Sequence, residues 1–280
     1  MSHIPLKLAF GHKARVGKDT ACEYIDKLFR SKLYRFATPV YDLAALIQNY
    51  LGKPNVKDPK LLQTIGVKLR EVYHDNIWVD VVMPNIEKDS LYNEQTPGNN
   101  TGVQVACVPD MRFKNEMAAL KKAGFVTIKI NRANRIIDRD PNHPSEIDLN
   151  NAEFDEVINN DYAPEHLYAI LNTIIYNYYS KVDEAFVEKF RYRIVANATI
   201  YSDQGESKVT YTTFSSINIE AAFKQFVLLV DANVSNEYQK NKDLNKSIDE
   251  SIEDYLNETF SMPCGDIMHK ITFNRISKYV

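Results

Sequence analysis

Residues 9–20 read Ala9-Phe10-Gly11-His12-Lys13-Ala14-Arg15-Val16-Gly17-Lys18-Asp19-Thr20, and this stretch decides the fold of the chain. A short apolar run, 4–10, leads into the basic turn, and a helical pattern, 20–29, follows it. Backbone N–H groups in such a turn and at the start of the helix converge on a phosphate, where the helix dipole favours negative charge. The order of strand, tight turn, Gly-Lys-x-Thr and helix therefore predicts a phosphate-binding loop of the P-loop type.

Within this loop each residue type has a defined chemical role. Lys18 would reach the β- and γ-phosphates of a nucleoside triphosphate, and Thr20 would offer its hydroxyl to Mg²⁺. Gly17 lets the backbone approach the phosphates closely. The predicted phosphate-binding residues are His12, Lys13, Ala14, Arg15, Val16, Gly17, Lys18, Asp19 and Thr20.

The loop departs from the usual P-loop pattern at its start and near its end. His12 stands where the first glycine is expected, and Gly11 lies one residue earlier. Asp19 separates Lys18 from Thr20, whereas many P-loops place the lysine directly before Ser or Thr. The alternative interpretation is a basic loop that only joins a strand to a helix.

Length and composition limit the classes of protein to which the chain can belong. A chain of 280 residues with 44% hydrophobic residues is long enough for one large or two modest domains. The net charge of −3 gives no cationic field that would attract nucleic acid. Three widely spaced cysteines fit free thiols in a reducing compartment. No signal peptide and no membrane-spanning run is evident, so we expect a cytoplasmic protein without nucleic-acid or membrane partners.

Up to about residue 180, short apolar runs alternate with helical patterns. Such alternation predicts an α/β fold in which helices flank a parallel sheet. A polar stretch, 88–101, reads as a surface loop, and a basic segment broken by prolines, 132–150, cannot be a simple helix. Strands are expected at 4–10, 33–37, 103–108, 125–130 and 156–158, and helices at 20–29, 38–51, 60–74, 77–87, 113–123 and 164–180.

From about residue 189 the pattern changes to that of a small α+β domain, which we expect to span 189–280. Alternating residues on either side of Asp203-Gln204-Gly205 predict a hairpin of strands 192–201 and 208–214. An amphipathic helix is expected at 218–237 and a last strand at 267–276, with a polar segment between them. The apolar stripe of the helix needs cover, from the hairpin or from a second subunit in a homodimer; it comprises Ala221, Phe223, Phe226 and Val230.

A second set of charged residues follows the apolar strand at 103–108. Asp110 and Arg112 come just after its carboxyl end, where open α/β sheets bind ligands. Asp110 could hold metal-bound water or a substrate group, and Arg112 could bind a phosphate through two hydrogen bonds. The alternative is a salt-bridged surface turn.

Together these segments resemble the bacteriophage deoxynucleoside monophosphate kinase family over about residues 4–175. The resemblance is carried by 13–20, by Leu61-Leu62-Gln63-Thr64-Ile65-Gly66 with Arg70, by 77–79, by Asp110-Met111-Arg112-Phe113-Lys114-Asn115-Glu116 and by His143-Pro144-Ser145-Glu146. It implies an adenylate-kinase-like domain, 1–182, with ATP and Mg²⁺ as cofactors and a deoxynucleoside monophosphate (dNMP) as the acceptor.

The resemblance also implies roles for individual residues. Lys18 and Thr20 match the ATP and Mg²⁺ positions, and Asp19 beside them would support the metal or the acceptor phosphate. The segment 132–150 looks like a lid that closes over the transferred phosphate. The residues that would bind the monophosphate are Lys60, Gln63, Arg70, Trp78, Asp110 and Arg112, and the catalytic set adds Arg132, Arg135 and Arg139 of the lid.

Several of these residues have a second interpretation. Trp78 on an apolar helix could belong to the core, and Arg70 could be a solvated charge. The motif 143–146 could be only a capped turn rather than part of a lid. Pro59 stands where the family pattern has a second basic residue, so one contact to the acceptor phosphate would be missing.

Two other functions remain open at this point. Phosphomevalonate-type and other small-metabolite kinases share a similar Gly-Lys-Asp loop. A non-catalytic nucleotide-binding sensor or scaffold, in which 189–280 is the working part, is the other alternative. The arginines at 112 and in the lid argue for catalysis, because a sensor has less need of cations that stabilise a transition state.

Overall fold

The structure is a computed structural model that describes residues 6–95, 104–137, 140–181, 184–233, 247–264 and 267–280. The chain forms two compact units. The first comprises Met1–Asn131 and Arg135–Val157, and the second comprises Arg132–Asn134 and Ile158–Val280. The sequence predicts that the first domain ends at residue 182 and that the second begins at residue 189, and this boundary stays a prediction.

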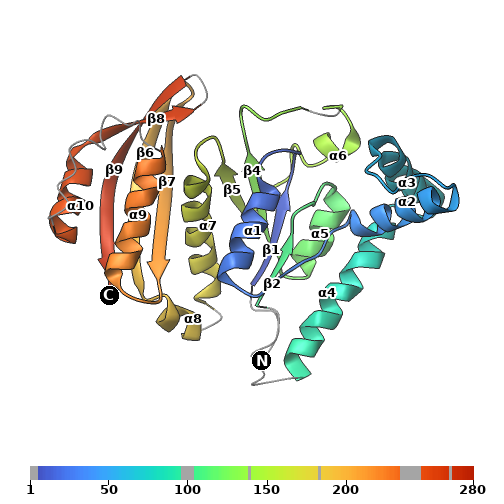
Figure 1. Ribbon diagram of the computed structural model, residues 1–280, viewed down its shortest axis with the longest axis horizontal. Helices are drawn as coiled ribbons and strands as arrows, with labels where there is room; N and C mark the ends of the chain where they lie inside the picture. Colours follow the sequence, from blue (N-terminus) through green and yellow to red (C-terminus); the bar gives the residue numbers. More distant parts are fainter. Residues whose placement is uncertain (1–5, 96–103, 138–139, 182–183, 234–246, 265–266) are drawn as a thin grey trace. The chain divides into compact units, whose positions relative to one another are not determined.

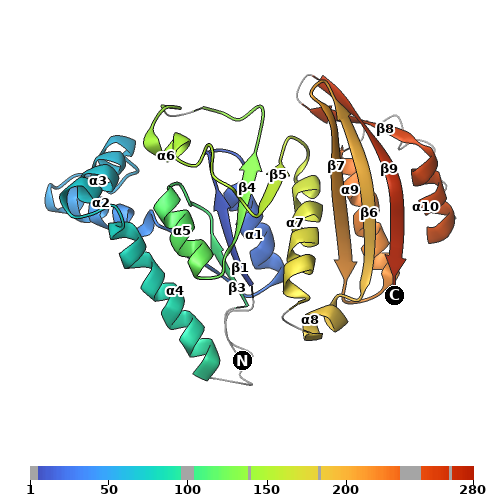
Figure 2. The same cartoon turned by 180° about the vertical axis from the view of Figure 1, so that it is seen from behind.

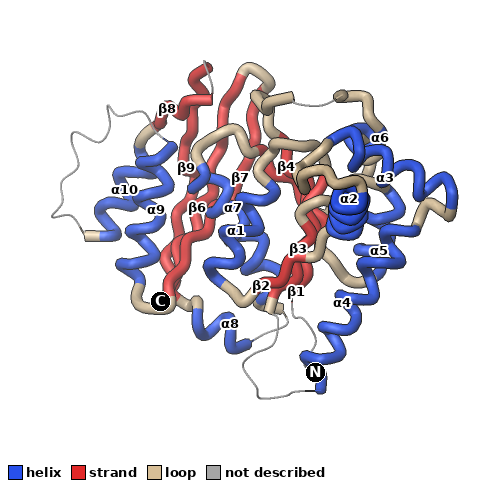
Figure 3. The backbone as a smooth tube through the Cα atoms, turned by 45° about the vertical axis from the view of Figure 1, so that its right-hand side comes forward, coloured by secondary structure: helices blue, strands red, loops and turns tan. Residues whose placement is uncertain are grey.

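A five-stranded parallel sheet in the order β2-β3-β1-β4-β5 confirms the predicted fold class. The central strand β1 pairs in parallel with β3 on one side and with β4 on the other (Figure 3). Every residue of β3 is buried, as expected for a strand covered on both faces. The strands are β1 (Leu6–Gly11), β2 (Ser31–Leu33), β3 (Val105–Val108), β4 (Val126–Asn131) and β5 (Glu156–Asn159).

Helices connect these strands in the order that right-handed crossovers require. The connections from β1 to β2 and from β3 to β4 run in opposite directions across the sheet, so α1 and α5 lie on opposite faces (Figures 1 and 2). The carboxyl ends of β1 and β3 therefore meet where such sheets bind ligands. The helices are α1 (Lys18–Leu28), α2 (Thr38–Tyr50), α3 (Pro59–Val72), α4 (Ile77–Gln95), α5 (Lys114–Lys122) and α6 (Pro144–Ile147).

Two local expectations in this unit are wrong. The polar stretch that begins at Lys88 is not all loop, because α4 continues to Gln95; the rest of it, 96–101, lies outside the described residues. The expected strand at 33–37 is shorter and earlier, since β2 ends at Leu33. The sequence pattern predicted that these two elements exist but not where they end, because helix and strand ends depend on tertiary packing.

Trp78 lies in the core beside the sheet. It is 3% exposed, packs within the main apolar cluster and donates its indole N–H to the carbonyl of Gly66 at 3.0 Å. The bond links α4 to α3 at Gly66, whose lack of a side chain leaves free space on the surface of α3. Of the two interpretations of Trp78, the structure favours the core residue.

Replacing this indole should therefore change stability strongly. We expect Trp78→Ala to lower the free energy of unfolding by about 3–5 kcal/mol, because it removes a large buried side chain and leaves a cavity. Trp78→Phe keeps most of the volume, loses the hydrogen bond to Gly66 and should cost clearly less. Urea unfolding followed by circular dichroism measures both variants. A loss below about 1 kcal/mol for Trp78→Ala would contradict the core position.

The second unit is built on an antiparallel sheet in the order β7-β6-β9-β8. The predicted hairpin is confirmed, with β6 and β7 joined at Ser202 and Gly205, where a φ of 113° favours glycine. Both α9 and α10 contact this sheet, α9 through β6 and β7 and α10 through β9 (Figure 1). The elements are α7 (Pro164–Tyr179), α8 (Glu184–Lys189), β6 (Tyr192–Ser202), β7 (Gly205–Ser215), α9 (Ile219–Asn233), α10 (Ile248–Asn257), β8 (Thr259–Cys264) and β9 (Ile267–Tyr279).

Packing in this unit confirms one prediction, and the structure adds three elements, α8, α10 and β8. Phe226 and Val230 of α9 are buried in the cluster that includes the hairpin residues, so the hairpin covers the apolar stripe. The helix α10 was missed because 236–258 is rich in charge, and the short strand β8 begins directly after that segment. The capping box in which Ser247 and Glu250 satisfy each other's backbone N–H groups is the sequence signal that would have located α10.

Helix α7 belongs to the second unit by its contacts. Asn172 donates to the carbonyl of Thr212 at 3.0 Å, and Thr173 donates to the carbonyl of Thr210 at 3.0 Å. Because β7 is an edge strand, some of its carbonyls have no partner strand, and side chains of α7 donate hydrogen bonds to them.

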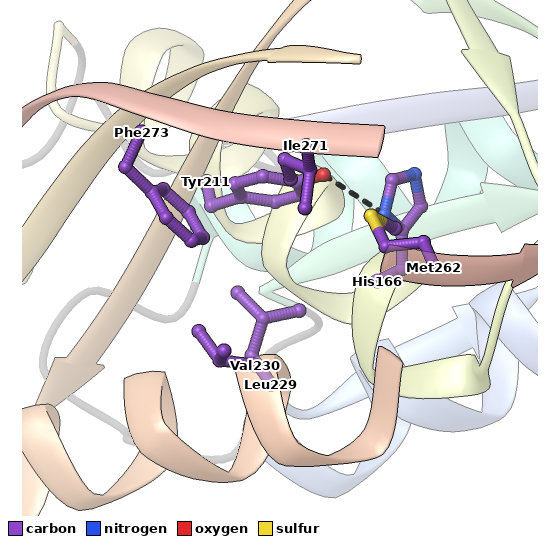
Figure 4. Close-up of a pocket in the computed structure, with 7 residues that line it drawn as sticks. All are labelled: His166, Tyr211, Leu229, Val230, Met262, Ile271 and Phe273. Atoms are coloured by element: carbon purple, nitrogen blue, oxygen red, sulfur yellow. Dashed lines mark hydrogen bonds between the residues drawn. The ribbon is translucent and has the colours of Figure 1, made fainter. Parts of the chain in front are cut away.

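A small cavity lies inside the second unit (Figure 4). His166, Tyr211, Met262 and Phe273 are among its lining residues, and the Tyr211 hydroxyl lies 3.0 Å from His166 Nδ1. Its volume of about 10 Å³ is comparable to the space that one water molecule needs. Burial lowers the pKa of His166 to about 3, so the imidazole is neutral near pH 7. A void of this size cannot hold a nucleotide.

Helix lengths and hydropathy give a further result. None of the helices within the described ranges combines the length and the apolar content that crossing a membrane requires.

Candidate functional site

The predicted loop and the charged turn after β3 are brought together at one edge of the parallel sheet. Register explains this arrangement: Leu6 pairs with Val105, and Ala9 pairs with Val108. Two parallel strands aligned in this way end side by side, so the segments that begin at His12 and at Asp110 are neighbours. The structure thus unites residues almost a hundred positions apart in sequence.

The loop has the left-handed backbone that phosphate-binding turns use. Gly17 has a φ of 104° and Arg15 has a φ of 59°, and α1 begins directly afterwards at Lys18. Lys18 is only 6% exposed, and its ammonium group donates to the carbonyl of Lys13 within the same loop. Lys18 is therefore held over the turn rather than extended into solvent.

Burial has a marked effect on the charge of this lysine. Burial, together with the charge of the nearby Arg112, lowers the pKa of Lys18 to about 7, while Glu146 opposes the shift. In the ligand-free protein much of Lys18 is therefore neutral at pH 8. Phosphate oxygens beside the ammonium group would restore the charge, because an anion favours the protonated form.

Binding of a nucleoside triphosphate should accordingly take up a proton. We expect uptake close to one proton at about pH 8, and a loss of affinity that approaches tenfold per pH unit above about pH 7. Titration calorimetry of a non-hydrolysable ATP analogue, in two buffers of different ionisation enthalpy, measures the uptake. The Lys18→Met variant should lose it. Equal binding heats in the two buffers for the wild-type protein would contradict this assignment.

Two of the predicted arginines converge on the loop. Arg112 donates to the carbonyl of His12 at 2.8 Å and to Glu146 at 2.8 Å. Arg135 donates to the carbonyl of Ala14 at 3.3 Å and lies 3.4 Å from Glu146.

The roles of the other two predicted lid arginines stay a prediction. Arg132 is exposed and belongs to the second compact unit, and Arg139 lies outside the described residues. The first part of the basic segment, 135–137, is irregular, and it leads to the short helix α6.

Asp110 is engaged by backbone groups of the chain. Its carboxylate accepts from the N–H of Phe36 at 3.2 Å and from the N–H of Ala37 at 2.9 Å. Burial raises the pKa of Asp110, and these two bonds oppose the increase. Asp110 thus fixes the start of α2, whose N-cap is Ala37.

Asp19 and Thr20 provide the oxygen ligands that Mg²⁺ prefers. Asp19 is 67% exposed, and its carboxylate pairs with Arg35 at 2.8 Å. The described residues contain no group of three or more His, Cys, Asp or Glu that could hold a metal ion alone. A hydroxyl, a carboxylate and nucleotide phosphates together suit Mg²⁺, which usually keeps few protein ligands. Sequence reasoning missed Arg35, since a basic residue after a short strand carries no motif.

The residues assigned to the monophosphate side have different surroundings. Lys60 and Gln63 are exposed on α3. Arg70 pairs with Glu116 at 2.8 Å, and its guanidinium lies 4.2 Å from the ring centroid of Phe113.

Glu116 connects this helix to the turn that carries Arg112. It accepts from the backbone N–H of Arg112 at 2.8 Å while it pairs with Arg70, and it is 2% exposed. Burial raises the pKa of Glu116 to about 7, although the hydrogen bond from the Arg112 N–H and the charge of Arg70 oppose the increase. Arg70 is therefore a partner of a buried carboxylate rather than a solvated charge.

His12 is buried in the position where the sequence lacks the expected glycine. Burial lowers its pKa to about 4, and the charges of Lys129 and Lys13 add to this effect. A hydrogen bond with the backbone of Glu146 opposes the shift. Within the described part of the chain, Nε2 of this neutral ring has no hydrogen-bond partner. The imidazole thus joins the loop to the segment that contains α6.

Comparison with known proteins gives one informative similarity. No protein-family model matches the chain. The chain is 31% identical over 125 residues to a protein of Acanthamoeba polyphaga mimivirus that carries the provisional name deoxynucleotide monophosphate kinase. The match covers 42% of this chain and 61% of the relative, so it spans less than two thirds of that protein.

Proposed function

We propose that the protein is a nucleotide kinase that transfers the γ-phosphate of ATP to a deoxynucleoside monophosphate, giving ADP and a deoxynucleoside diphosphate. The observation that carries the proposal is the meeting of Lys18 and Arg112 at the adjacent carboxyl ends of β1 and β3. The name of the mimivirus relative supports a nucleotide kinase in general terms. The acceptor is inferred from the motifs that resemble the phage family.

Phosphoryl transfer requires alignment and charge neutralisation more than covalent chemistry. Lys18 would follow the transferred phosphate, and Arg112 and Arg135 would neutralise its equatorial oxygens. The monophosphate acceptor is already anionic, so no strong general base is needed. Thr20 and Asp19 would hold Mg²⁺, which would supply positive charge that offsets the charge of the ATP phosphates.

On the acceptor side we propose two kinds of role. Lys60 and Gln63, which are exposed on α3, would contact the monophosphate. Arg70, Asp110 and Trp78 have partners within the protein, and they would act by fixing the elements that surround the acceptor. We further propose that the whole site lies within 1–182 and that 189–280 contributes no catalytic group.

The test is ADP release by the full-length protein with ATP and Mg²⁺ against a panel of acceptors. The panel contains the four common dNMPs, the matching ribonucleotides and phosphomevalonate. Turnover with a dNMP supports the proposal. Turnover with phosphomevalonate alone would replace it with the metabolite-kinase alternative, and binding of an ATP analogue without any turnover would replace it with the sensor.

A further inference from the structure

We propose that Glu146 is a positioning residue whose carboxylate holds Arg112 and Arg135 against the phosphate-binding loop before substrates bind. This inference rests on the proposed kinase function for its kinetic consequences, but its geometry stands on the described residues alone. The resemblance points only to the motif that contains Glu146, as part of a lid.

The carboxylate has three protein donors and no exposure to solvent. Oε1 accepts from Arg112 at 2.8 Å, and Oε2 accepts from the backbone N–H of Ala14 at 3.2 Å. Arg135 lies 3.4 Å from Oε2. Glu146 is 0% exposed, so water does not compete for these bonds. A buried carboxylate with charged donors of this kind forms stronger hydrogen bonds than a surface pair does.

Each arginine also reaches the loop directly. Arg112 donates to the carbonyl of His12, and Arg135 donates to the carbonyl of Ala14. One carboxylate thus joins three segments: the loop after β1, the turn after β3 and the basic segment that leads into α6. These segments are separated in sequence by up to 132 positions, and their common contact with Glu146 joins the two guanidinium groups through one side chain.

Charge makes this carboxylate necessary. Lys18 and Arg112 are cations at the adjacent carboxyl ends of β1 and β3, and like charges at a buried site repel each other. Glu146 pairs with both arginines and is the carboxylate that offsets this repulsion. Without the carboxylate, Lys18 and the two arginines would face one another across a buried space. Removing one partner of a buried ion pair leaves charge that nothing compensates. The guanidinium groups would then turn away from the positions from which they could meet a phosphate.

Other contacts anchor the same segment, so Glu146 is not required merely to hold it in place. Asp148 accepts from the backbone N–H of Lys114 at 2.7 Å and ties the end of α6 to α5. His143 is the N-cap of α6, and its side chain accepts a hydrogen bond from the backbone N–H of Ser145. Asp148→Asn is therefore a matched control, because it weakens the attachment without touching either arginine.

The experiment compares Glu146→Gln and Asp148→Asn in the full-length protein. We expect Glu146→Gln to lower kcat by about a hundredfold, with less than about threefold change in the affinity for a non-hydrolysable ATP analogue. Asp148→Asn should keep kcat within about threefold. In an Arg112→Ala background the Glu146→Gln effect should shrink severalfold, because residues that act through one another are not additive. Equal losses in the two single variants, or an undiminished effect in that background, would overturn the proposal.

A second measurement separates this inference from the proposed function. Loss of the carboxylate should free the two guanidinium groups, which arginine-labelled NMR reports in the absence of substrate as a change in the side-chain signals of Arg112 and Arg135. If Glu146→Gln does not fold, Glu146→Asp, which keeps the charge but shortens the side chain by one methylene group, carries the same measurement. Unchanged signals of both arginines would overturn the positioning role even in an active enzyme. A wild-type protein with no turnover but the expected change in these signals would contradict the kinase alone.

Discussion

Lys18→Ala is expected to lower turnover by at least about a hundred- to a thousandfold, the largest effect we predict for a single substitution. Lys18 begins α1 directly after the left-handed Gly17, and its ammonium group already lies over the loop. No other lysine of the loop occupies that position, since Lys13 supplies the carbonyl to which Lys18 donates. Steady-state kinetics with ATP and the best acceptor measure the loss. Activity within tenfold of wild type would contradict the P-loop assignment.

The same substitution should not destabilise the protein. The pKa of Lys18 is lowered in the folded state from 10.5 to about 7, so folding favours the neutral amine. Stability from this group is present above pH 10.5 and is lost as the pH falls toward 7, where the buried charge opposes folding. At pH 7 the variant should therefore have an equal or higher Tm. The exposed Lys53 provides the control, because Lys53→Ala should change neither kcat nor Tm.

Arg112→Ala is expected to lower kcat for the dNMP reaction by about a hundredfold or more, with a much smaller effect on ATP binding. The guanidinium lies between the loop and Glu146, where it would meet the transferred phosphate. Arg112→Lys keeps the charge but cannot form two parallel hydrogen bonds, so it should recover only part of the rate.

Titration with a non-hydrolysable ATP analogue separates the two sides of the reaction. A collapse in affinity for that analogue, with an unchanged KM for the acceptor, would assign Arg112 to the donor instead. Some loss of Tm is expected in Arg112→Ala, because among the described residues Glu146 then keeps Arg135 and the backbone N–H of Ala14 as donors.

Local pattern predicted the elements of the parallel sheet well. The apolar run before His12, the helix that starts near Lys18 and the strand that ends at Val108 all lie within a few residues of their expected places. Charge-rich segments were predicted less well. Both α10 and β8 lie in or beside such a segment, and the partners of their buried apolar residues lie on α9 and β9, as in the ring contacts Phe226–Tyr255 and Phe260–Phe273.

The sequence by itself determined that a phosphate-binding loop follows β1 and that an acidic and a basic residue follow β3, because both signals depend on residues next to one another in the chain. The tertiary structure alone decided which charges pair. Glu116 and Glu146 stand in motifs and Arg35 stands in none, but no motif says which charge each of them pairs with. Each gains its role from a partner that lies 34 or more positions away or on another element. Burial in the folded protein determined the charge of the site residues. Desolvation lowers the pKa of Lys18 and of His12 because the folded chain removes them from water, and no local pattern encodes that environment.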